Sequence, residues 1–202
     1  MIFSTACAYY KADSMTSDIH HDEQGKPLSH SESEKRRLER EAAKFFMRAY
    51  EKQFHQPMRH IWHNQPAKPD ISCFLNGAEL DLEIAHLYAS EQEARIAAGD
   101  NPPPAAADQY HGEEHLWAYL ADLASMETGR KLHTALQRIL TSKARKRYHS
   151  HRVWLVIRNA SPLWQHDDFL PIVRHLVLPP HHFEQIWLLT DFKGENPLLR
   201  LG

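Results

Sequence analysis

The sequence predicts a single α/β domain in which a central mixed β-sheet is flanked by helices, an α+β arrangement. Short apolar runs of strand length alternate with longer segments of helical periodicity, and an Asn-Gly pair joins two of the runs. The 202 residues are 42% hydrophobic, which is enough for one core and not for two. Aromatic residues make up 10% of the chain and argue against disorder. We therefore expect one domain over residues 1–202.

The helical segments begin after a polar N-terminal region. Residues 1–30 are expected to form an arm or loop. Ser31 with Glu34 matches a capping box, and the apolar residues that follow at helical spacing predict a helix over residues 32–54. Further helices are expected over 113–126, 130–148 and 167–176. Residues 89–111 contain three consecutive prolines, so we expect a mobile insertion loop there and not a domain boundary.

Strands are expected over residues 58–62, 71–75, 78–87, 153–157 and 186–189. The turn Asn76-Gly77 is the strongest hairpin signal in the chain, because a type I′ turn needs positive φ at both central residues. If these two residues form the loop, the register of the hairpin is determined. One face then carries three apolar pairs: Leu75 with Ala78, Cys73 with Leu80, and Ile71 with Leu82.

The other face of this hairpin carries three carboxylates close together. The same register sets Phe74 opposite Glu79, Ser72 opposite Asp81, and Asp70 opposite Glu83. Directly opposed residues have Cβ atoms about 4.5–5.5 Å apart, and like charges at that spacing repel. A hard divalent cation such as Mg²⁺ would offset the repulsion, since it prefers oxygen ligands. The alternative is a solvated outer face on which water screens the charges.

A lysine lies on the apolar stripe of the helix expected over 130–148. The stripe is formed by Leu132, Ala135, Leu136, Ile139 and Leu140, and Lys143 falls near its centre. Such a lysine must extend along its stem to solvent or find a carboxylate. Beside the carboxylate hairpin, its ammonium could position a water nucleophile or offset developing negative charge. The alternative is a solvated lysine at the last helical turn, where a cation suits the helix dipole.

Pro69-Asp70, followed about a dozen residues later by Glu83-Ile84-Ala85, resembles the PD-(D/E)XK nuclease superfamily. The resemblance covers residues 32–158 and implies a restriction-endonuclease-like core of a helix, a three-stranded meander, a helix and a further strand. It implies that Asp70 and Glu83 bind metal and that Glu41 is the acidic residue of the first helix. The family pattern has lysine two residues after the second acid, where this chain has Ala85. Some members carry that lysine on the following helix, which makes Lys143 its counterpart.

The resulting expectation is a Mg²⁺- or Mn²⁺-dependent endonuclease that hydrolyses phosphodiester bonds in DNA, with RNA left open. Asp70, Glu83 and Lys143 are the expected catalytic residues, and Glu41, Asp81 and His86 the expected auxiliary ones. A basic run predicts contacts to phosphate, although a solvated helix end would look the same; it consists of Arg145, Lys146, Arg147 and Arg152.

Two alternatives remain open from the sequence. Because Ala85 replaces the motif lysine, the chain could be a catalytically degenerate module that binds nucleic acid or protein on the same fold. A zinc-dependent hydrolase is the other alternative, although no HExxH motif or closed set of four ligands is present. Its candidate ligands are His20, His21, His60, His63, His181 and His182.

Charge and cysteine content indicate the setting. The net charge of −2 and the pI near 6.8 provide no global basic field, so a nucleic-acid partner needs a local patch. Two cysteines, Cys7 and Cys73, without a CxxC pattern are typical of a reducing cytoplasm. We expect no membrane partner, because no run of about 18 apolar residues and no signal-peptide pattern occurs. A homodimer is left open.

Overall fold

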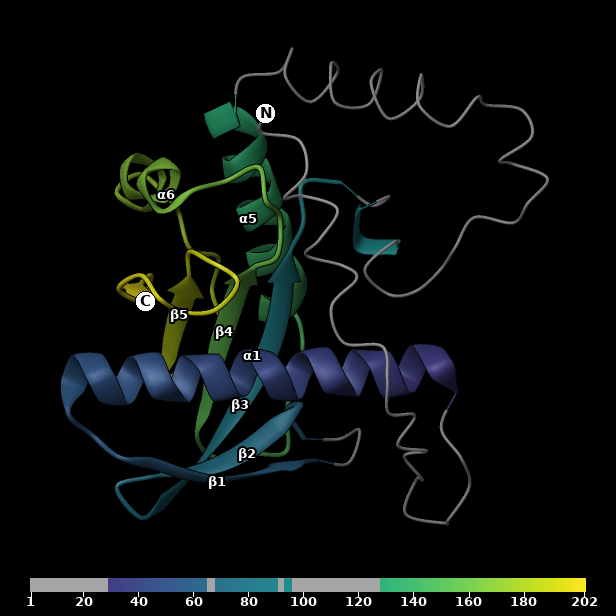
Figure 1. Cartoon of the computed structure of the whole chain (residues 1–202), viewed down its shortest axis with the longest axis vertical. Helices are drawn as coiled ribbons and strands as arrows, with labels where there is room; N and C mark the ends of the chain where they lie inside the picture. The colour runs from purple at the N-terminus through teal and green to yellow at the C-terminus, as the bar shows by residue number, and fades with distance from the viewer. Residues whose placement is uncertain (1–28, 65–67, 91–92, 96–127) are drawn as a thin grey trace, which may run out of the picture.

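The computed structural model describes residues 29–64, 68–90, 93–95 and 128–202 (Figure 1). It contains one six-stranded sheet with the strand order β1-β2-β3-β4-β5-β6. The elements in chain order are α1 (His30–Phe54), β1 (Met58–His63), β2 (Ile71–Leu75), β3 (Ala78–Leu87), α5 (Thr128–Ala144), β4 (Val153–Asn159), α6 (His166–Val173), β5 (Gln185–Leu189) and β6 (Leu199–Arg200).

The sheet is mixed, as expected for an α+β fold. Strands β1, β2 and β3 form an antiparallel meander, β3, β4 and β5 are parallel, and β6 returns antiparallel to β5. Helix α1 crosses one face of the sheet, and α5 and α6 cover the other face (Figure 1). This arrangement agrees with the predicted class. Among the helices of the described ranges, none is long and apolar enough to cross a membrane.

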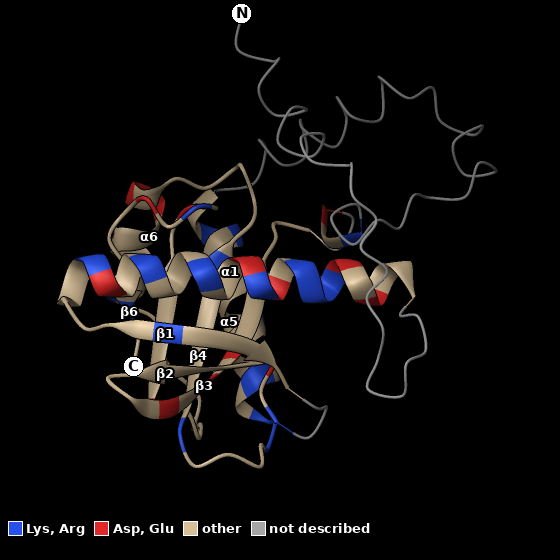
Figure 2. Cartoon of the chain, turned by 60° about the horizontal axis from the view of Figure 1, so that its bottom comes forward, with Lys and Arg blue, Asp and Glu red and all other residues tan. Residues whose placement is uncertain are grey.

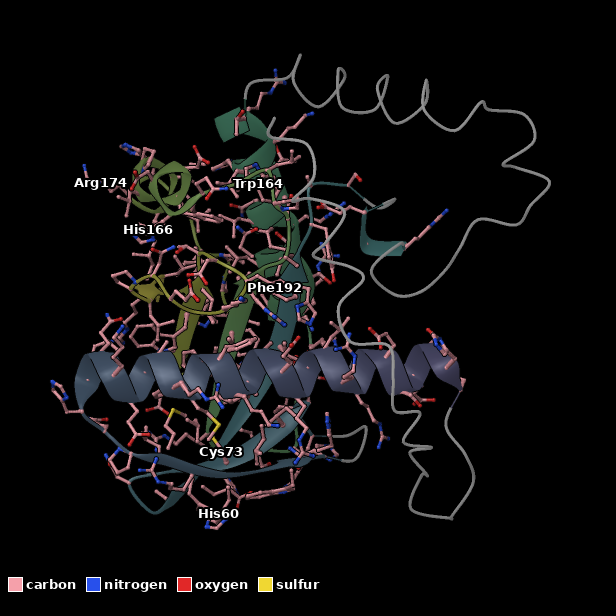
Figure 3. All side chains as sticks on the ribbon, viewed as in Figure 1. His60, Cys73, Trp164, His166, Arg174 and Phe192 are labelled. Atoms are coloured by element: carbon pink, nitrogen blue, oxygen red, sulfur yellow. The ribbon has the colours of Figure 1, made fainter. Side chains whose placement is uncertain are left out.

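The Asn-Gly hairpin has the predicted register. Ile71 pairs with Leu82, Cys73 with Leu80, and Leu75 with Ala78. Asn76 and Gly77 have φ angles of 52° and 82°, the left-handed conformation that the type I′ turn requires. The apolar face of the hairpin packs under α1, where Cys73 lies between the helix and the first strands (Figure 3).

The core beneath α1 is aromatic. Phe46 and Tyr50 are buried, and their rings contact those of Trp154 on β4 and Trp187 on β5 at centroid distances of 5.3–6.3 Å. Such ring pairs stabilise a core beyond their burial alone. This packing holds α1 against β4 and β5.

Several boundaries differ from the prediction. Helix α1 begins two residues earlier than expected, because Ser29 and not Ser31 is its N-cap and accepts a hydrogen bond from the Glu32 amide at 3.2 Å. Helix α5 ends at Ala144 and not at the predicted residue 148. Just after its end, the Lys146 amide donates to the Lys143 carbonyl at 3.1 Å and closes a turn. The two-residue strand β6 was not predicted. The expected helix over 113–126, most of the loop over 89–111 and residues 1–28 lie outside the described residues.

Candidate active site

The carboxylates of Asp70 and Glu83 meet at the open end of the hairpin. Asp70 directly precedes β2, and its Oδ2 accepts a hydrogen bond of 2.8 Å from the backbone N–H of Ile84. Since Ile84 follows Glu83 in β3, this bond holds the Asp70 carboxylate beside that of Glu83. Glu83 is only 2% exposed. The predicted pair is therefore formed, one member anchored through a backbone amide and the other buried under α5.

Lys143 reaches this pair from α5. Its Nζ donates to Glu83 Oε1 at 2.6 Å and to the Ile84 carbonyl at 3.0 Å. Ala85, where the family pattern would have lysine, is buried against the same helix. The ammonium group beside the second acid thus comes from the following helix, at the position that the apolar stripe indicated.

Lys146 is a second cation on the same carboxylate. Its Nζ lies 3.1 Å from Glu83 Oε1, although its side chain is 52% exposed, against 18% for Lys143. The sequence predicted Lys146 only as a phosphate contact. Lys146 lies in the turn that follows α5, where its amide donates to the Lys143 carbonyl.

The electrostatics of the cluster follow from burial and from these two cations. Burial opposes ionisation of Glu83, but the charges and hydrogen bonds of Lys143 and Lys146 hold its pKa below the ordinary value. Burial and the nearby charge of Glu83 raise the pKa of Asp70. Burial works against the charge of Lys146, yet the negative charge of Glu83 raises its pKa.

Glu39 is the acidic residue of α1 that belongs to this cluster, not the predicted Glu41. It is 7% exposed, and burial together with the charge of Asp70 raises its pKa to about 7. Glu39 lies three and four residues before the buried Ala42 and Ala43, so helical spacing turns it toward the sheet. That spacing was available in the sequence and could have identified it.

Glu41 has a different role from the one expected. Its Oε2 accepts hydrogen bonds of 3.3 Å from both terminal nitrogens of Arg158, a fully buried residue of β4. Arg158 Nε donates to the Phe192 carbonyl at 2.8 Å, and its guanidinium stacks on the Phe192 ring at 3.6 Å. Glu41 therefore compensates a buried charge and joins α1 to β4.

Asp81 also lies apart from the carboxylate pair. Its side chain accepts a hydrogen bond from the Ser72 hydroxyl, its cross-strand neighbour, and Asn64 Nδ2 donates to the same hydroxyl at 2.6 Å. Asp81 is buried, at 3% exposure. Its position on the face was predicted, but its contacts indicate a structural hydrogen-bond chain from Asn64, just after β1, through Ser72 on β2 to Asp81 on β3.

His86 lies on the opposite face of β3 from Glu83, as the alternation of the strand predicted. Both of its ring nitrogens are buried and have no hydrogen-bond partner within the described residues. Burial, with the charges of Arg158 and Lys143, lowers its pKa to about 3, so the ring is neutral at pH 7. This environment does not bring His86 into the Asp70–Glu83 pair.

Replacement of His86 by Leu is expected to reduce the acid sensitivity of the fold. The imidazole has a pKa near 6.5 in the unfolded chain. Below that pH the unfolded chain binds a proton that the folded chain excludes, so the free energy of unfolding decreases as the pH is lowered. Between pH 7 and pH 5 the original chain should lose about 2 kcal/mol more than His86→Leu. Urea unfolding at both pH values measures this difference.

The comparison with the original chain is needed because the titration of Glu39 changes the stability in the opposite direction over the same pH range. Its raised pKa means that the folded chain binds the extra proton, and this contribution is lost as pH rises toward 7. The Glu39 contribution is present in both the original chain and His86→Leu, so it cancels when their losses of stability are compared. Equal losses in the two chains would contradict the assignment of acid sensitivity to His86.

The predicted basic run is largely engaged within the molecule. Arg147 contacts the His182 ring, and Arg152 donates to Glu184 at 2.7 Å while its guanidinium lies over the Trp154 ring. Lys146 forms an ion pair with Glu83. Arg145 is the member of the run that lines an open hollow along α5. The run is therefore not one continuous patch.

The histidines do not form a centre in the described part of the chain. His60 and His63 lie on β1, with His60 on the outer side of the strand (Figure 3), whereas His181 and His182 lie between α6 and β5. Within the described ranges no group of three or more His, Cys, Asp and Glu side chains comes together to hold a metal ion. His20 and His21 lie outside those ranges.

The donors of the Asp70–Glu83 pair fit a hard cation. Mg²⁺ is usually held by one or two carboxylates, with water and substrate phosphate completing its coordination, so two acids suffice. Both acids are hard oxygen donors, and the cations that now neutralise them are flexible lysine side chains. Sulfur and imidazole donors, which other metals prefer, are not part of the pair.

The fold and the site together define an α+β protein with a buried carboxylate–lysine cluster at the open end of a hairpin. Comparisons with protein-family models, with curated proteins and with solved structures give no match to this chain. The chemistry of the cluster is therefore the basis for a functional proposal.

Proposed function

We propose that this chain is a Mg²⁺-dependent nuclease that hydrolyses phosphodiester bonds in DNA or RNA. The observation that carries the proposal is the Lys143 ammonium, 2.6 Å from Glu83 in a pair of carboxylates that the hairpin register brings together. The order of helix, three-stranded meander, helix and parallel strand also supports it, since this is the order that the PD-(D/E)XK resemblance implies.

Asp70 and Glu83 would hold the metal ion. Such an ion supplies positive charge to the phosphate oxygens and promotes ionisation of a water nucleophile. Asp70 suits this role because its second oxygen, Oδ2, is fixed by the Ile84 amide, which limits the rotation of the carboxylate. Glu83 suits it because its pKa is lowered, so it is ionised at neutral pH.

Lys143 would orient the attacking water or offset charge on the phosphate. An ammonium group has three N–H donors, and two of them are used by Glu83 and the Ile84 carbonyl. The third is left for a water or for a phosphate oxygen. In the reaction, water forms a bond to phosphorus, the bond from phosphorus to one ester oxygen breaks, and that oxygen leaves with a proton.

Lys146 would contribute to substrate binding. It is half exposed, and Lys143 keeps Glu83 neutralised if Lys146 moves away. When a cation occupies the carboxylate pair, repulsion would release Lys146 toward solvent, where a phosphate is its natural partner. This assigns the two lysines different functions on the basis of their exposure.

Cleavage of plasmid DNA and of a labelled RNA by the purified chain tests the proposal. Cleavage should occur with Mg²⁺ or Mn²⁺, stop with a chelator in excess, and return when the metal is restored. Cleavage that continues in the chelator would contradict a metal-dependent mechanism. Salt-sensitive binding without cleavage in either metal would favour the degenerate binding module, and stoichiometric zinc in the purified protein would favour the zinc hydrolase.

A further inference from the structure

The segment from Thr128 to Arg152 is the most basic part of the chain. It contains no Asp or Glu, although the whole chain has 26 acidic residues and a net charge of −2. Its cations are Arg130, Lys131, Arg138, Lys143, Arg145, Lys146, Arg147 and Arg152. The chain is close to neutral overall, but α5 and the residues after it, up to Arg152, carry only positive charges among their Lys, Arg, Asp and Glu side chains.

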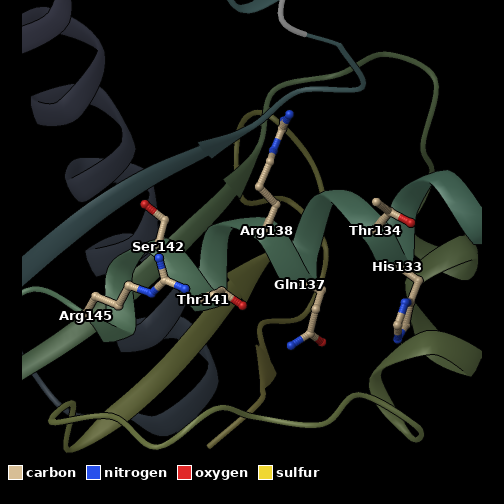
Figure 4. A pocket seen from close by; sticks show the side chains of 7 residues that line it. All are labelled: His133, Thr134, Gln137, Arg138, Thr141, Ser142 and Arg145. Carbon is tan, nitrogen blue, oxygen red and sulfur yellow. The ribbon is translucent and has the colours of Figure 1, made fainter.

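The exposed side of α5 is hollowed and lined by polar side chains (Figure 4). The hollow has a volume of about 580 Å³. Its lining residues are His133, Thr134, Gln137, Arg138, Thr141, Ser142 and Arg145. Arg138 and Arg145 are exposed, and neither forms an ion pair within the described part of the chain. Hydroxyl, amide and guanidinium groups without a carboxylate are the donors that contact phosphate oxygens in nucleic-acid complexes.

The hollow lies on the same helix from which Lys143 reaches the candidate active site. Ser142 lies four residues after Arg138 within α5, so their side chains are neighbours. Arg145, one residue past the end of the helix, lines the same hollow and directly precedes Lys146. Lys146 contacts Glu83 directly. From Arg138 to Ala144, where α5 ends, the helix rises about 9 Å, the length of about two to three nucleotide steps along one strand.

Helix α1 also has exposed basic residues, but acidic residues alternate with them along the helix (Figure 2). Glu34 pairs with Arg37 and Glu51 with Arg59, and further acids lie between them. A surface of mixed sign produces a weaker field at a polyanion than a surface of one sign. Charge complementarity therefore favours α5 over α1.

We propose that the exposed side of α5 binds the phosphate backbone of the nucleic-acid substrate and leads it to Asp70 and Glu83. Arg138 and Arg145 are the main contacts, with hydroxyl groups of Thr141 and Ser142 between them. The proposal rests on the proposed function for the identity of the partner, and it replaces the predicted basic run, whose Arg147 and Arg152 are engaged elsewhere, as the substrate-binding surface.

Binding of a labelled oligonucleotide to the full chain, measured by fluorescence anisotropy in a chelator so that cleavage cannot occur, tests the assignment. The variant Arg138→Gln/Arg145→Gln should bind at least about tenfold more weakly, and the slope of log K against log salt should decrease by about 2, one for each arginine–phosphate interaction that the variant removes. Arg40→Gln/Arg48→Gln is the matched control, with two exposed arginines removed from α1. It should change affinity less than about twofold.

The outcomes separate this proposal from the nuclease proposal. Equal affinity of the α5 variant and the original chain would contradict the surface, even if the original chain cleaves DNA. Loss of binding in the α5 variant with no cleavage by the original chain would support the surface and contradict the nuclease. If the original chain binds neither DNA nor RNA, the surface is wrong.

Discussion

Asp70→Asn and Glu83→Gln should each reduce metal-dependent cleavage by at least about 10²-fold. Each change keeps the size of the side chain and removes the negative charge that would hold the metal ion in the proposed site, and the charge stabilisation that such an ion supplies is several kcal/mol. Initial rates of plasmid nicking at saturating Mg²⁺ measure the loss. Circular dichroism and urea unfolding of each variant show whether the fold is intact.

Asp81→Asn is the matched control for this series. Asp81 is a buried acid of the same strand and face, two residues before Glu83, but it is bonded to Ser72. Its replacement should leave the cleavage rate within about threefold, because it lies outside the metal-binding pair. Equal loss in all three variants would mean that the effect is structural, and unchanged cleavage in Asp70→Asn would reject that residue as a ligand.

Lys143→Met should destabilise the fold by about 3 kcal/mol, because it removes the main partner of a carboxylate that is 2% exposed. Lys146→Met should cost less than about 1 kcal/mol, since its side chain is half exposed and Lys143 remains on Glu83. Urea unfolding at pH 7 gives both values. Equal losses of stability in Lys143→Met and Lys146→Met would contradict the prediction that the more buried lysine contributes more to the free energy of unfolding.

The double variant Lys143→Met/Glu83→Leu separates stability from activity. Replacement of both members of a buried ion pair by apolar residues is often neutral or stabilising, so the double variant should recover most of the stability that Lys143→Met loses. It should remain inactive, because a metal ligand and the positioning ammonium are both absent. A double variant that cleaves at the original rate would reject both roles.

Much of the hairpin could be predicted from the sequence, because its information is local. Asn76 and Gly77 determine the turn, the turn determines the register, and the register brings Asp70 to Glu83. Lys143 was predictable as a candidate, because a lysine on an apolar stripe either extends along its stem to solvent or finds a carboxylate, and in the structure it finds Glu83. The register of the hairpin and the place of Lys143 on the apolar stripe need only the periods of strand and helix; the partner of Lys143 lies 60 residues away in the chain.

The remaining features depend on contacts between distant parts of the chain. Glu41 and Glu39 differ by about 200° around α1; helical spacing turns Glu39 toward the sheet, but its position beside Asp70 depends on the packing of Ala42, Ala43 and Phe46 on the sheet. The basic run was predicted as one patch, but its partners Glu184 and His182 lie more than 30 residues away. Lys146 lies beyond the end of α5, and its contact with Glu83 joins residues 63 positions apart in the chain.

The ammonium–carboxylate contact between α5 and β3 closes a loop of 60 residues. The entropy cost of such a closure grows only with the logarithm of loop length, by about 0.6 kcal/mol for each doubling. The intervening chain can therefore lengthen or shorten at little thermodynamic cost, provided that β3 and α5 still pack together. Variation in the length of this connection would leave the contact between Lys143 and Glu83 intact.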